Sequence, residues 1–139
     1  MTDLSATGLP VRSGRRGPAR LLLVEPDFVM RRTVAMTARS IEIADVAEAA
    51  TFTRGEELLA QQAYDGLLVS LDAQGEGLKL VQAVRDGRTE TAAQAPMAVL
   101  VEKIDAATVL ALKTHGIARV MLKPCKVRTL LECIEALAR

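Results

Sequence analysis

Short runs of apolar residues alternate along this chain with segments in which apolar residues recur at helical spacing. The run Leu21–Val24 has no polar interruption and is stopped by Glu25, Pro26 and Asp27. An uninterrupted run of this kind is typical of a strand that is buried on both faces, as strands of parallel sheets are. Pro26 suits an early helix position, so we expect the segment after it to be helical.

The same alternation continues to the end of the chain and predicts five strands, each followed by a helix. The expected strands are 21–24, 41–47, 66–71, 96–101 and 118–122. The expected helices are 28–40, 53–62, 77–85, 105–115 and 127–138. Regular alternation with short loops requires parallel strands joined by right-handed crossovers. We therefore expect an α/β fold, a doubly wound five-stranded parallel sheet with helices on both faces.

Individual helix positions carry further expectations. Asp105 is expected to cap the start of the fourth helix, and Gly116 is expected just after its end. The helix residues expected to face the core are Phe28, Val34, Ala35, Ala38, Leu58, Leu59, Leu78, Val81, Val84, Val127, Leu130, Leu131, Ile134 and Leu137. The last five form one stripe and predict the clearest amphipathic helix of the chain.

The first 19 residues differ from the rest. They mix Gly, Pro, Ser and Arg without periodicity, and such a segment buries too little apolar surface to offset its ordering entropy. We expect a flexible tail over 1–19 and one domain over 20–139, which would stand alone because no output domain follows it. The arginines Arg12, Arg15, Arg16 and Arg20 could contact an acidic partner or phosphates, or could simply keep the tail solvated.

Composition narrows the function classes. The chain has two Phe, one Tyr, no Trp and a formal net charge of +1. So few aromatic rings argue against folds that stack on bases, and so small a charge gives no general attraction to nucleic acid or membrane. Cys125 and Cys133 form no metal-binding pattern, and the chain shows neither a signal peptide nor an apolar run of about 18 residues. We expect reduced thiols in a cytoplasmic protein.

The ends of the expected strands lie at the edge of the sheet where ligands bind in such folds. The residues there are Glu25, Asp27, Ser70, Asp72, Val101, Glu102, Lys123 and Pro124. Converging carboxylates could hold a hard cation, with the lysine pairing a phosphoryl or carboxylate group. They could equally be ordinary solvated charges, and periodicity alone leaves both interpretations open.

Several segments together form a recognisable pattern. They are LLLVEPD at the first strand, Gly55-Glu56-Glu57-Leu58, YDGLLVS followed by GLKLVQAVR, PMAVLV, and Gly116 followed by VMLKP. With these segments the chain resembles a response-regulator receiver domain of the CheY-like type. The resemblance implies the flavodoxin-like strand order 2-1-3-4-5 and a cis Lys123–Pro124 peptide bond. It also implies a role in bacterial two-component or phosphorelay signalling.

Receivers carry their phosphoacceptor aspartate at the end of the third strand, and the resemblance places Ser70 there. It places Glu25 and Pro26 at the acidic pair that holds Mg²⁺, with Asp27 one position too late. A serine hydroxyl offers no anionic oxygen, so it forms no acyl phosphate and contributes little to cation binding. We expect no resident cofactor or metal, and at most weak Mg²⁺ binding in a degenerate acidic pocket of Glu25, Asp27 and Asp72.

The switch positions are also replaced. By the resemblance, Val101 stands where receivers have the Thr or Ser that answers phosphorylation, and Val120 stands where they have a switching aromatic. Lys123 and Pro124 are retained. We therefore expect a pseudo-receiver that is not an enzyme and acts by protein–protein contact with a histidine kinase, a phosphotransfer protein or a downstream target. The implied contact surface is the fourth helix, fifth strand and fifth helix, which could also form a homodimer.

Two alternatives remain open at this point. In the first, the chain is a working receiver that is phosphorylated on Asp72, with Mg²⁺ held by Glu25, Asp27 and Asp72. In the second, it is a sensor of a nucleotide second messenger that binds through Arg119, Lys113 or the N-terminal arginines. Scattered arginines more often just solvate a surface, which makes the second alternative the weaker one.

Two further side chains could carry chemistry. Cys125 precedes the last helix, whose N-terminus could lower the pKa of its thiol, or it could be a small thiol packed against the core. His115 has no Cys, His or acid at ligand spacing, so we interpret it as a residue of a helix C-terminus.

Overall fold

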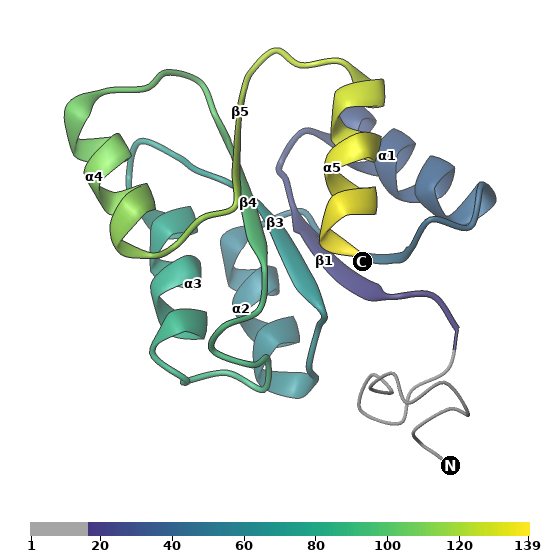
Figure 1. The fold of residues 1–139 in the computed structure, drawn as a ribbon, viewed down its shortest axis with the longest axis horizontal. Helices are drawn as coiled ribbons and strands as arrows, with labels where there is room; N and C mark the ends of the chain where they lie inside the picture. The colour runs from purple at the N-terminus through teal and green to yellow at the C-terminus, as the bar shows by residue number, and fades with distance from the viewer. Residues whose placement is uncertain (1–16) are drawn as a thin grey trace.

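The computed structural model describes residues 17–139, which form a three-layer α/β sandwich around one parallel sheet (Figure 1). The strands are β1 (Arg20–Val24), β2 (Asp45–Ala49), β3 (Gly66–Ser70), β4 (Met97–Val101) and β5 (Arg119–Leu122). The helices are α1 (Phe28–Ser40), α2 (Phe52–Gln61), α3 (Glu76–Arg85), α4 (Ala106–Thr114) and α5 (Val127–Leu137). The expected tail over 1–19 lies largely outside the described residues.

The strand order is β2-β1-β3-β4-β5 and every pairing is parallel, which confirms the predicted fold class. Helices α1 and α5 cover one face of the sheet, and α2, α3 and α4 lie on the other (Figure 1). The order changes direction beside β1, so β1 and β3 are neighbours although a helix–strand–helix segment separates them in sequence. In such sheets ligands bind at the carboxyl edge near this point.

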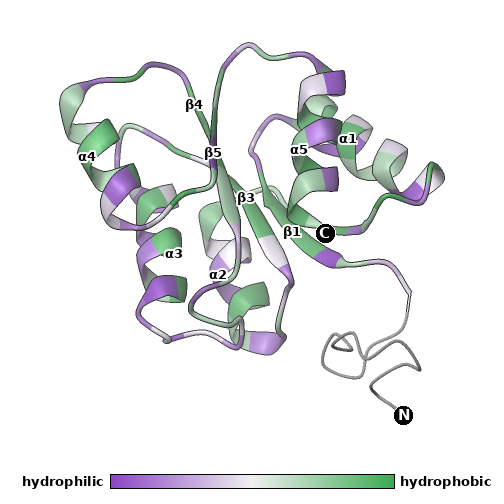
Figure 2. Cartoon of the chain, viewed as in Figure 1, coloured by the Kyte–Doolittle hydropathy of each residue, from purple (hydrophilic) through white to green (hydrophobic). Residues whose placement is uncertain are grey.

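Two aliphatic clusters, one on each face of the sheet, form the core. Side chains of successive strand residues point to opposite faces, so Leu21 and Leu23 join the cluster under α1 and α5 whereas Leu22 and Val24 join the cluster under α2 and α3. Because both faces are covered, the strands need apolar residues at every position, and the hydropathy colouring shows them as mostly hydrophobic ribbons (Figure 2). This is why the uninterrupted apolar runs predicted the strands correctly.

The second strand lies later in the chain than predicted. The pattern indicated 41–47, but β2 spans Asp45–Ala49. Ile41 and Ile43 instead end α1, because their backbone N–H groups donate to carbonyls of that helix, and Glu42 between them takes a positive φ of 59°. Two apolar residues at the C-terminus of a helix were therefore mistaken for the start of a strand.

Some predicted core positions are wrong. Phe28 was expected on the buried face of α1 but is 65% exposed. Val127 is also exposed at the start of α5, where Cys133 completes the buried stripe with the leucine and isoleucine residues. In α3, Leu80 is buried where Leu78 was expected, and Leu78 is only half-buried. Arg20, counted among the tail arginines, is the first residue of β1.

Helix α4 is the least anchored helix of the described chain. Its predicted caps are confirmed, since the Asp105 carboxylate accepts from the Thr108 N–H and Gly116 follows the helix with a φ of 62°. Leu112 is its one buried residue, and Leu110 is 67% exposed. An apolar helix that buries so little of its surface presents unpaired hydrophobic area to solvent.

Arg85, at the end of α3, ties the end of α4 to the loop before β4. Its guanidinium donates to the carbonyl oxygens of His115 at 2.6 Å and Gly116 at 3.2 Å. It also donates to the carbonyls of Ala93 at 2.8 Å and Ala95 at 2.7 Å. A planar fork with several donors can bridge two backbone segments in this way, whereas a point-charge ammonium cannot.

None of the helices within residues 17–139 is both long enough and apolar enough to cross a membrane.

Candidate functional site

Three of the residues predicted at the carboxyl edge of the sheet meet in one buried cluster. Glu25 follows β1, Ser70 ends β3, and Lys123 follows β5. The parallel registers of β1 with β3, of β3 with β4, and of β4 with β5 bring these strand ends to one edge of the sheet. Glu25 and Ser70 are 1% and 2% exposed.

The Glu25 carboxylate is the centre of this cluster. Its Oε1 accepts a hydrogen bond from Ser70 Oγ at 2.6 Å and pairs with Lys123 Nζ at 2.8 Å. Its Oε2 accepts from the backbone N–H of Asp27 at 2.9 Å. A buried carboxylate is stable only when it is paired and hydrogen-bonded, and both oxygens of Glu25 meet that requirement here.

The backbone of Glu25 is held just as firmly. Its N–H donates to the carbonyl of Ala49 at the end of β2, and its carbonyl accepts from Nη1 of Arg31 at 3.0 Å. Arg31 is 8% exposed and also pairs with Glu48 through its Nε at 3.2 Å. Sequence reasoning missed Arg31 and Glu48, because the pair joins a helix to a strand and only the packing of α1 on β2 brings them together.

The side-chain carboxylates of the two aspartates of the predicted acidic pocket make their contacts outside the cluster, although the backbone N–H of Asp27 donates to Glu25. Asp27 caps α1, since its Oδ1 accepts from the Met30 N–H at 2.9 Å. Asp72 accepts from the Gly77 N–H through its Oδ1 at 2.8 Å, and so holds the turn into α3. Within residues 17–139, no group of three or more Asp, Glu, His or Cys side chains is arranged as metal ligands.

The turn after β3 is tight because α3 begins against the strand end. A side chain carbon at Gly77 would collide with the backbone carbonyl of Ser70. Gly77 therefore allows a close approach that no other residue permits, and this approach places Asp72 over the first turn of α3. The turn between β3 and α3 is thus held by its own capping contact.

The two expected switch positions lie beside this edge without polar contact to it. Val101 ends β4 and is 3% exposed, and Val120 lies in β5 at 39% exposure. A cavity of about 460 Å³ opens between the β3–α3 turn and the start of α4, and its lining includes Asp72, Val101 and Glu102. The Val101 side chain has no donor that could bond to a charged group in this cavity, and Val120 lines a different groove, between α4 and β5.

Lys123 reaches the cluster from a turn with the predicted cis geometry. The Lys123–Pro124 peptide bond is cis, which confirms that expectation. The lysine N–H donates to the carbonyl of Val101 at 2.7 Å, which extends the β4–β5 pairing by one residue. Its side chain is 21% exposed, so the ammonium group lies between the buried carboxylate and solvent.

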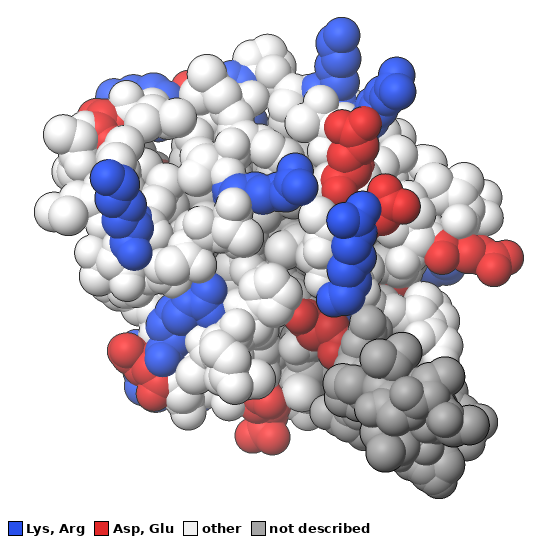
Figure 3. Space-filling model, viewed as in Figure 1, with Lys and Arg blue, Asp and Glu red and all other residues white. Residues whose placement is uncertain are grey.

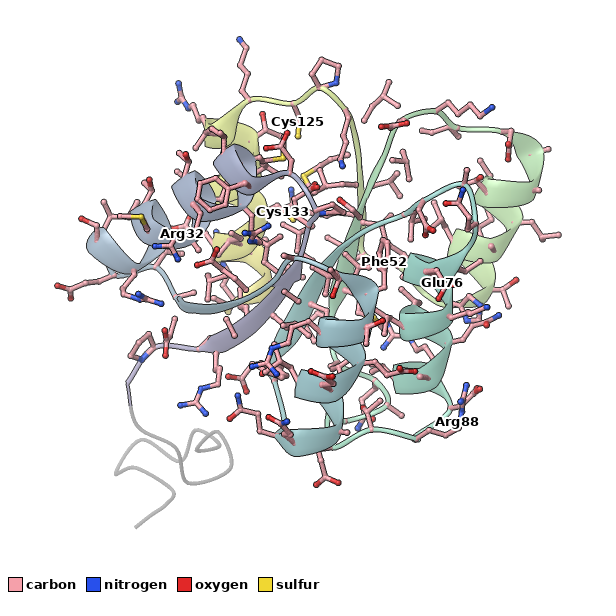
Figure 4. All side chains as sticks on the ribbon, turned by 180° about the vertical axis from the view of Figure 1, so that it is seen from behind. Arg32, Phe52, Glu76, Arg88, Cys125 and Cys133 are labelled. Carbon is pink, nitrogen blue, oxygen red and sulfur yellow. The ribbon has the colours of Figure 1, made fainter. Side chains whose placement is uncertain are left out.

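The hypothesis of an activated thiol at Cys125 is wrong. Partial burial raises the pKa of the Cys125 thiol above its ordinary value, and this effect outweighs the attraction of the neighbouring Lys123 ammonium group. Cys125 packs against the core cluster that contains Cys133; Cys125 lies just before α5, and Cys133 lies within that helix (Figure 4). His115 is the C-cap residue of α4, as its position suggested.

Comparisons with known proteins support the architecture. No protein-family model and no curated protein matches the sequence. Among solved structures, the chemotaxis protein CheY4 of Vibrio cholerae superposes with a TM-score of 0.72 at 20% identity, covering 86% of this chain and 98% of that one. The chain has the fold of a receiver domain.

Two further structures show the same fold. HP1043, described as an orphan response regulator of H. pylori, matches with a TM-score of 0.73 at 20% identity over 90% of this chain and 100% of that one. A response regulator from Burkholderia pseudomallei, solved with a phosphorylated aspartic acid, a calcium ion and citrate, matches with a TM-score of 0.68 at 20% identity. That match covers 84% of this chain and 66% of the other.

Proposed function

We propose that this protein is a cytoplasmic receiver-like signalling module that works through protein–protein contact, with impaired or absent phosphoacceptor chemistry. The observation that carries the proposal is the closed Glu25–Ser70–Lys123 cluster. The Ser70 hydroxyl donates its hydrogen bond to Glu25 Oε1, and the charge of Lys123 is balanced by the same carboxylate oxygen. The partner it would signal to is a histidine kinase, a phosphotransfer protein or a downstream target.

The cluster leaves little for phosphoryl transfer to use. An acyl phosphate needs a carboxylate nucleophile, and Ser70 has none to offer at the end of β3. Lys123, the residue that would pair an incoming phosphoryl group, already has an internal anion at 2.8 Å, the Glu25 carboxylate. A phosphoryl group would have to displace Glu25, whose carboxylate would then lie buried without its charge partner.

Asp72 is the alternative acceptor, and its contacts argue against that role. Its carboxylate already accepts the Gly77 N–H at 2.8 Å, and its backbone carbonyl accepts from the Gly75 N–H at 3.2 Å. Turning Asp72 toward Glu25 would break the turn into α3. A working receiver would also need Mg²⁺ held by Glu25, Asp27 and Asp72, and those carboxylates make separate local contacts.

The contact surface that we propose consists of α4, β5 and α5. Its exposed apolar side chains are Ile104, Val109, Leu110, Val120, Leu122 and Val127. A groove of about 210 Å³ between α4 and β5 is lined mostly by apolar residues of this surface. On the face of the molecule that Figure 3 shows, basic side chains are spread out and several lie beside acidic ones, so they do not form one positive patch. Such a surface suits a protein partner, or a second copy of the chain, better than a polyanion.

Phosphorylation is tested by incubating the protein with acetyl phosphate and Mg²⁺ and measuring its intact mass. We expect no added phosphate on the wild-type chain. A labile phosphate that disappears in Asp72→Asn would overturn the proposal in favour of the working receiver. The matched control is Asp86→Asn, which removes an exposed carboxylate after α3, outside the predicted acidic pocket.

The contact surface is tested with charge substitutions at exposed apolar positions. Leu110→Glu and Leu122→Glu should abolish self-association or capture of a cognate kinase, measured by light scattering and by pull-down. Met36→Glu is the control, because Met36 is 55% exposed on α1, a helix that is not part of the proposed surface. Unchanged association in the first two variants would exclude this surface.

A further inference from the structure

A second concave surface, separate from the Glu25 cluster, lies between the first turns of α1 and α2. This shallow, open groove has a volume of about 560 Å³ and is lined by Phe28, Arg31, Arg32, Glu48, Ala50 and Arg54. Figure 4 shows Arg32 on α1 and Phe52 at the start of α2, the two helices that flank it. The groove follows the ends of β1 and β2, and so lies on the carboxyl edge of the sheet, where doubly wound folds bind ligands.

The groove has an excess of positive charge. Three guanidinium groups line it together with a single carboxylate, that of Glu48. Glu48 Oε1 pairs with Arg31 Nε at 3.2 Å, and Glu48 Oε2 pairs with Arg32 Nη1 at 2.8 Å. One carboxylate therefore balances two arginines, which leaves one of these charges uncompensated before Arg54 is considered.

Arg54 adds to this charge from the first turn of α2. Its pairing with Glu57 at 3.1 Å is an i,i+3 contact between two side chains that are each about half exposed. Such exposed pairs contribute little and exchange readily for a better anion. The N-terminus of α2, which begins two residues after the lining residue Ala50, also favours negative charge.

The groove also displays an aromatic ring. Phe28 is 65% exposed, whereas Tyr64 is buried and Phe52 is half-buried. The guanidinium carbon of Arg31 lies over the Phe28 ring at 5.5 Å from its centre. Arg31 is itself fixed by Glu48 and by the carbonyl of Glu25, so it orients the ring. An exposed ring held by a buried arginine is a preorganised stacking platform.

We propose that this groove binds a nucleoside phosphate, with the base stacked on Phe28 and the phosphates held by Arg32 and Arg54. Arginine forks bind phosphate oxygens in pairs of hydrogen bonds, and an aromatic face accepts any base. Arg31 is the positioning residue, because it holds the ring and closes the floor of the groove. The inference does not rest on the signalling role proposed above, and it places a nucleotide site away from the arginines and lysine that the sequence suggested.

The test is a calorimetric titration of the full chain with two probes, adenosine diphosphate and inorganic pyrophosphate. We expect adenosine diphosphate to bind with a dissociation constant of about 10–100 μM, and pyrophosphate to bind more weakly because it lacks a base. Both affinities should fall as salt is raised, because the phosphates are held by exposed arginines.

Variants separate the two parts of the site. Arg32→Gln with Arg54→Gln should weaken both probes by about tenfold or more, since each loses charge-assisted hydrogen bonds. Phe28→Ala should weaken adenosine diphosphate by about fivefold or more and leave pyrophosphate unchanged. The controls are Arg88→Gln and Val29→Ala. Arg88 is an exposed arginine in the loop after α3, and Val29 is an exposed apolar residue next to Phe28 in α1.

Three outcomes would overturn the inference. One is an absence of heat with adenosine diphosphate at about 1 mM, well above the expected constant. Another is an equal loss of affinity in Arg88→Gln, which would indicate general attraction to a charged surface. The third is unchanged adenosine diphosphate affinity in Phe28→Ala, which would remove the nucleoside from the site. All substituted side chains other than Arg88 lie on the surface of helices, and circular dichroism checks that each variant is folded.

Discussion

Replacement of Lys123 by methionine should destabilise the fold by leaving the Glu25 carboxylate buried without its charge partner. Glu25 is 1% exposed and Lys123 Nζ lies 2.8 Å from its Oε1. Removing one partner of a fully buried ion pair costs about 3–5 kcal/mol. Lys123 is 21% exposed, so water can enter beside the carboxylate and we expect the lower value of about 2–3 kcal/mol. For a domain of this size that loss lowers the melting temperature by about 8–12 °C.

A double-mutant cycle distinguishes a lost pair from a general loss of packing. Urea unfolding of Lys123→Met, Glu25→Gln and the double variant gives the coupling free energy between the two side chains. Replacing both charged partners removes the unpaired buried charge, so the double variant should be more stable than the sum of the single losses predicts. We expect a coupling of about 1.5 kcal/mol or more.

The matched control is Lys126→Met, an exposed lysine in the same turn, whose effect should stay within about 0.5 kcal/mol. A coupling below about 0.5 kcal/mol between Lys123 and Glu25 would refute the reasoning, because the two side chains would then contribute independently. The pair would in that case have no role in holding the carboxyl edge of the sheet closed.

Three other predictions address the site and its support. Ser70 Oγ lies 2.6 Å from Glu25 Oε1, so Ser70→Asp places a second carboxylate beside Glu25. We expect the repulsion between the two carboxylates to lower the free energy of unfolding by about 2 kcal/mol, and millimolar Mg²⁺ to restore it. Equal thermal stability with and without Mg²⁺ would contradict this prediction. Arg85→Lys loses most of the four hydrogen bonds that the guanidinium donates to backbone carbonyls, so the free energy of unfolding should fall by about 2 kcal/mol. Amide exchange at the end of α4 should become faster. Protection from exchange equal to that of the wild type would show that the guanidinium group is dispensable. Burial raises the pKa of Cys133 to about 11 and also raises the pKa of Cys125. A disulfide reagent at about pH 8 should therefore modify Cys125 slowly and Cys133 only when the chain unfolds. Prompt reaction of both thiols in the folded protein would contradict this prediction. Since the pKa of Cys133 is higher in the folded chain, its contribution to stability is complete below about pH 9 and is lost as the pH rises toward about 11.

Most of the fold could be read from the pattern of the sequence. A strand such as β3 is buried at all of its positions, and its continuous apolar run records that burial directly. The caps of α4 were equally legible, because Asp105 and Gly116 satisfy local requirements of the backbone. The error at β2 shows where this kind of prediction fails. Ile41 and Ile43 look like strand residues in the sequence, but their backbone N–H groups bond to carbonyls at the end of α1.

Less of the site could be read in this way. The strand ends identified Glu25, Ser70 and Lys123 as neighbours, because parallel strands share one edge. The pattern could not show that one oxygen of Glu25 accepts the hydrogen bond from Ser70 and also pairs with Lys123. Ser70 is 45 residues from Glu25 in sequence, and these contacts depend on the directions of the side chains within the packed sheet. Nor could it show that Asp72 is committed to the Gly77 N–H.

The sequence by itself therefore determined the elements, their order and the residues that reach the carboxyl edge. These follow from the period of apolar residues and from local capping, which act over a few positions of the chain. Only the tertiary structure decided which of those residues bond to one another, and that Phe28 and three arginines form an exposed groove. Such contacts join segments far apart in sequence, and their partners are selected by the packing of helices on the sheet rather than by any local preference.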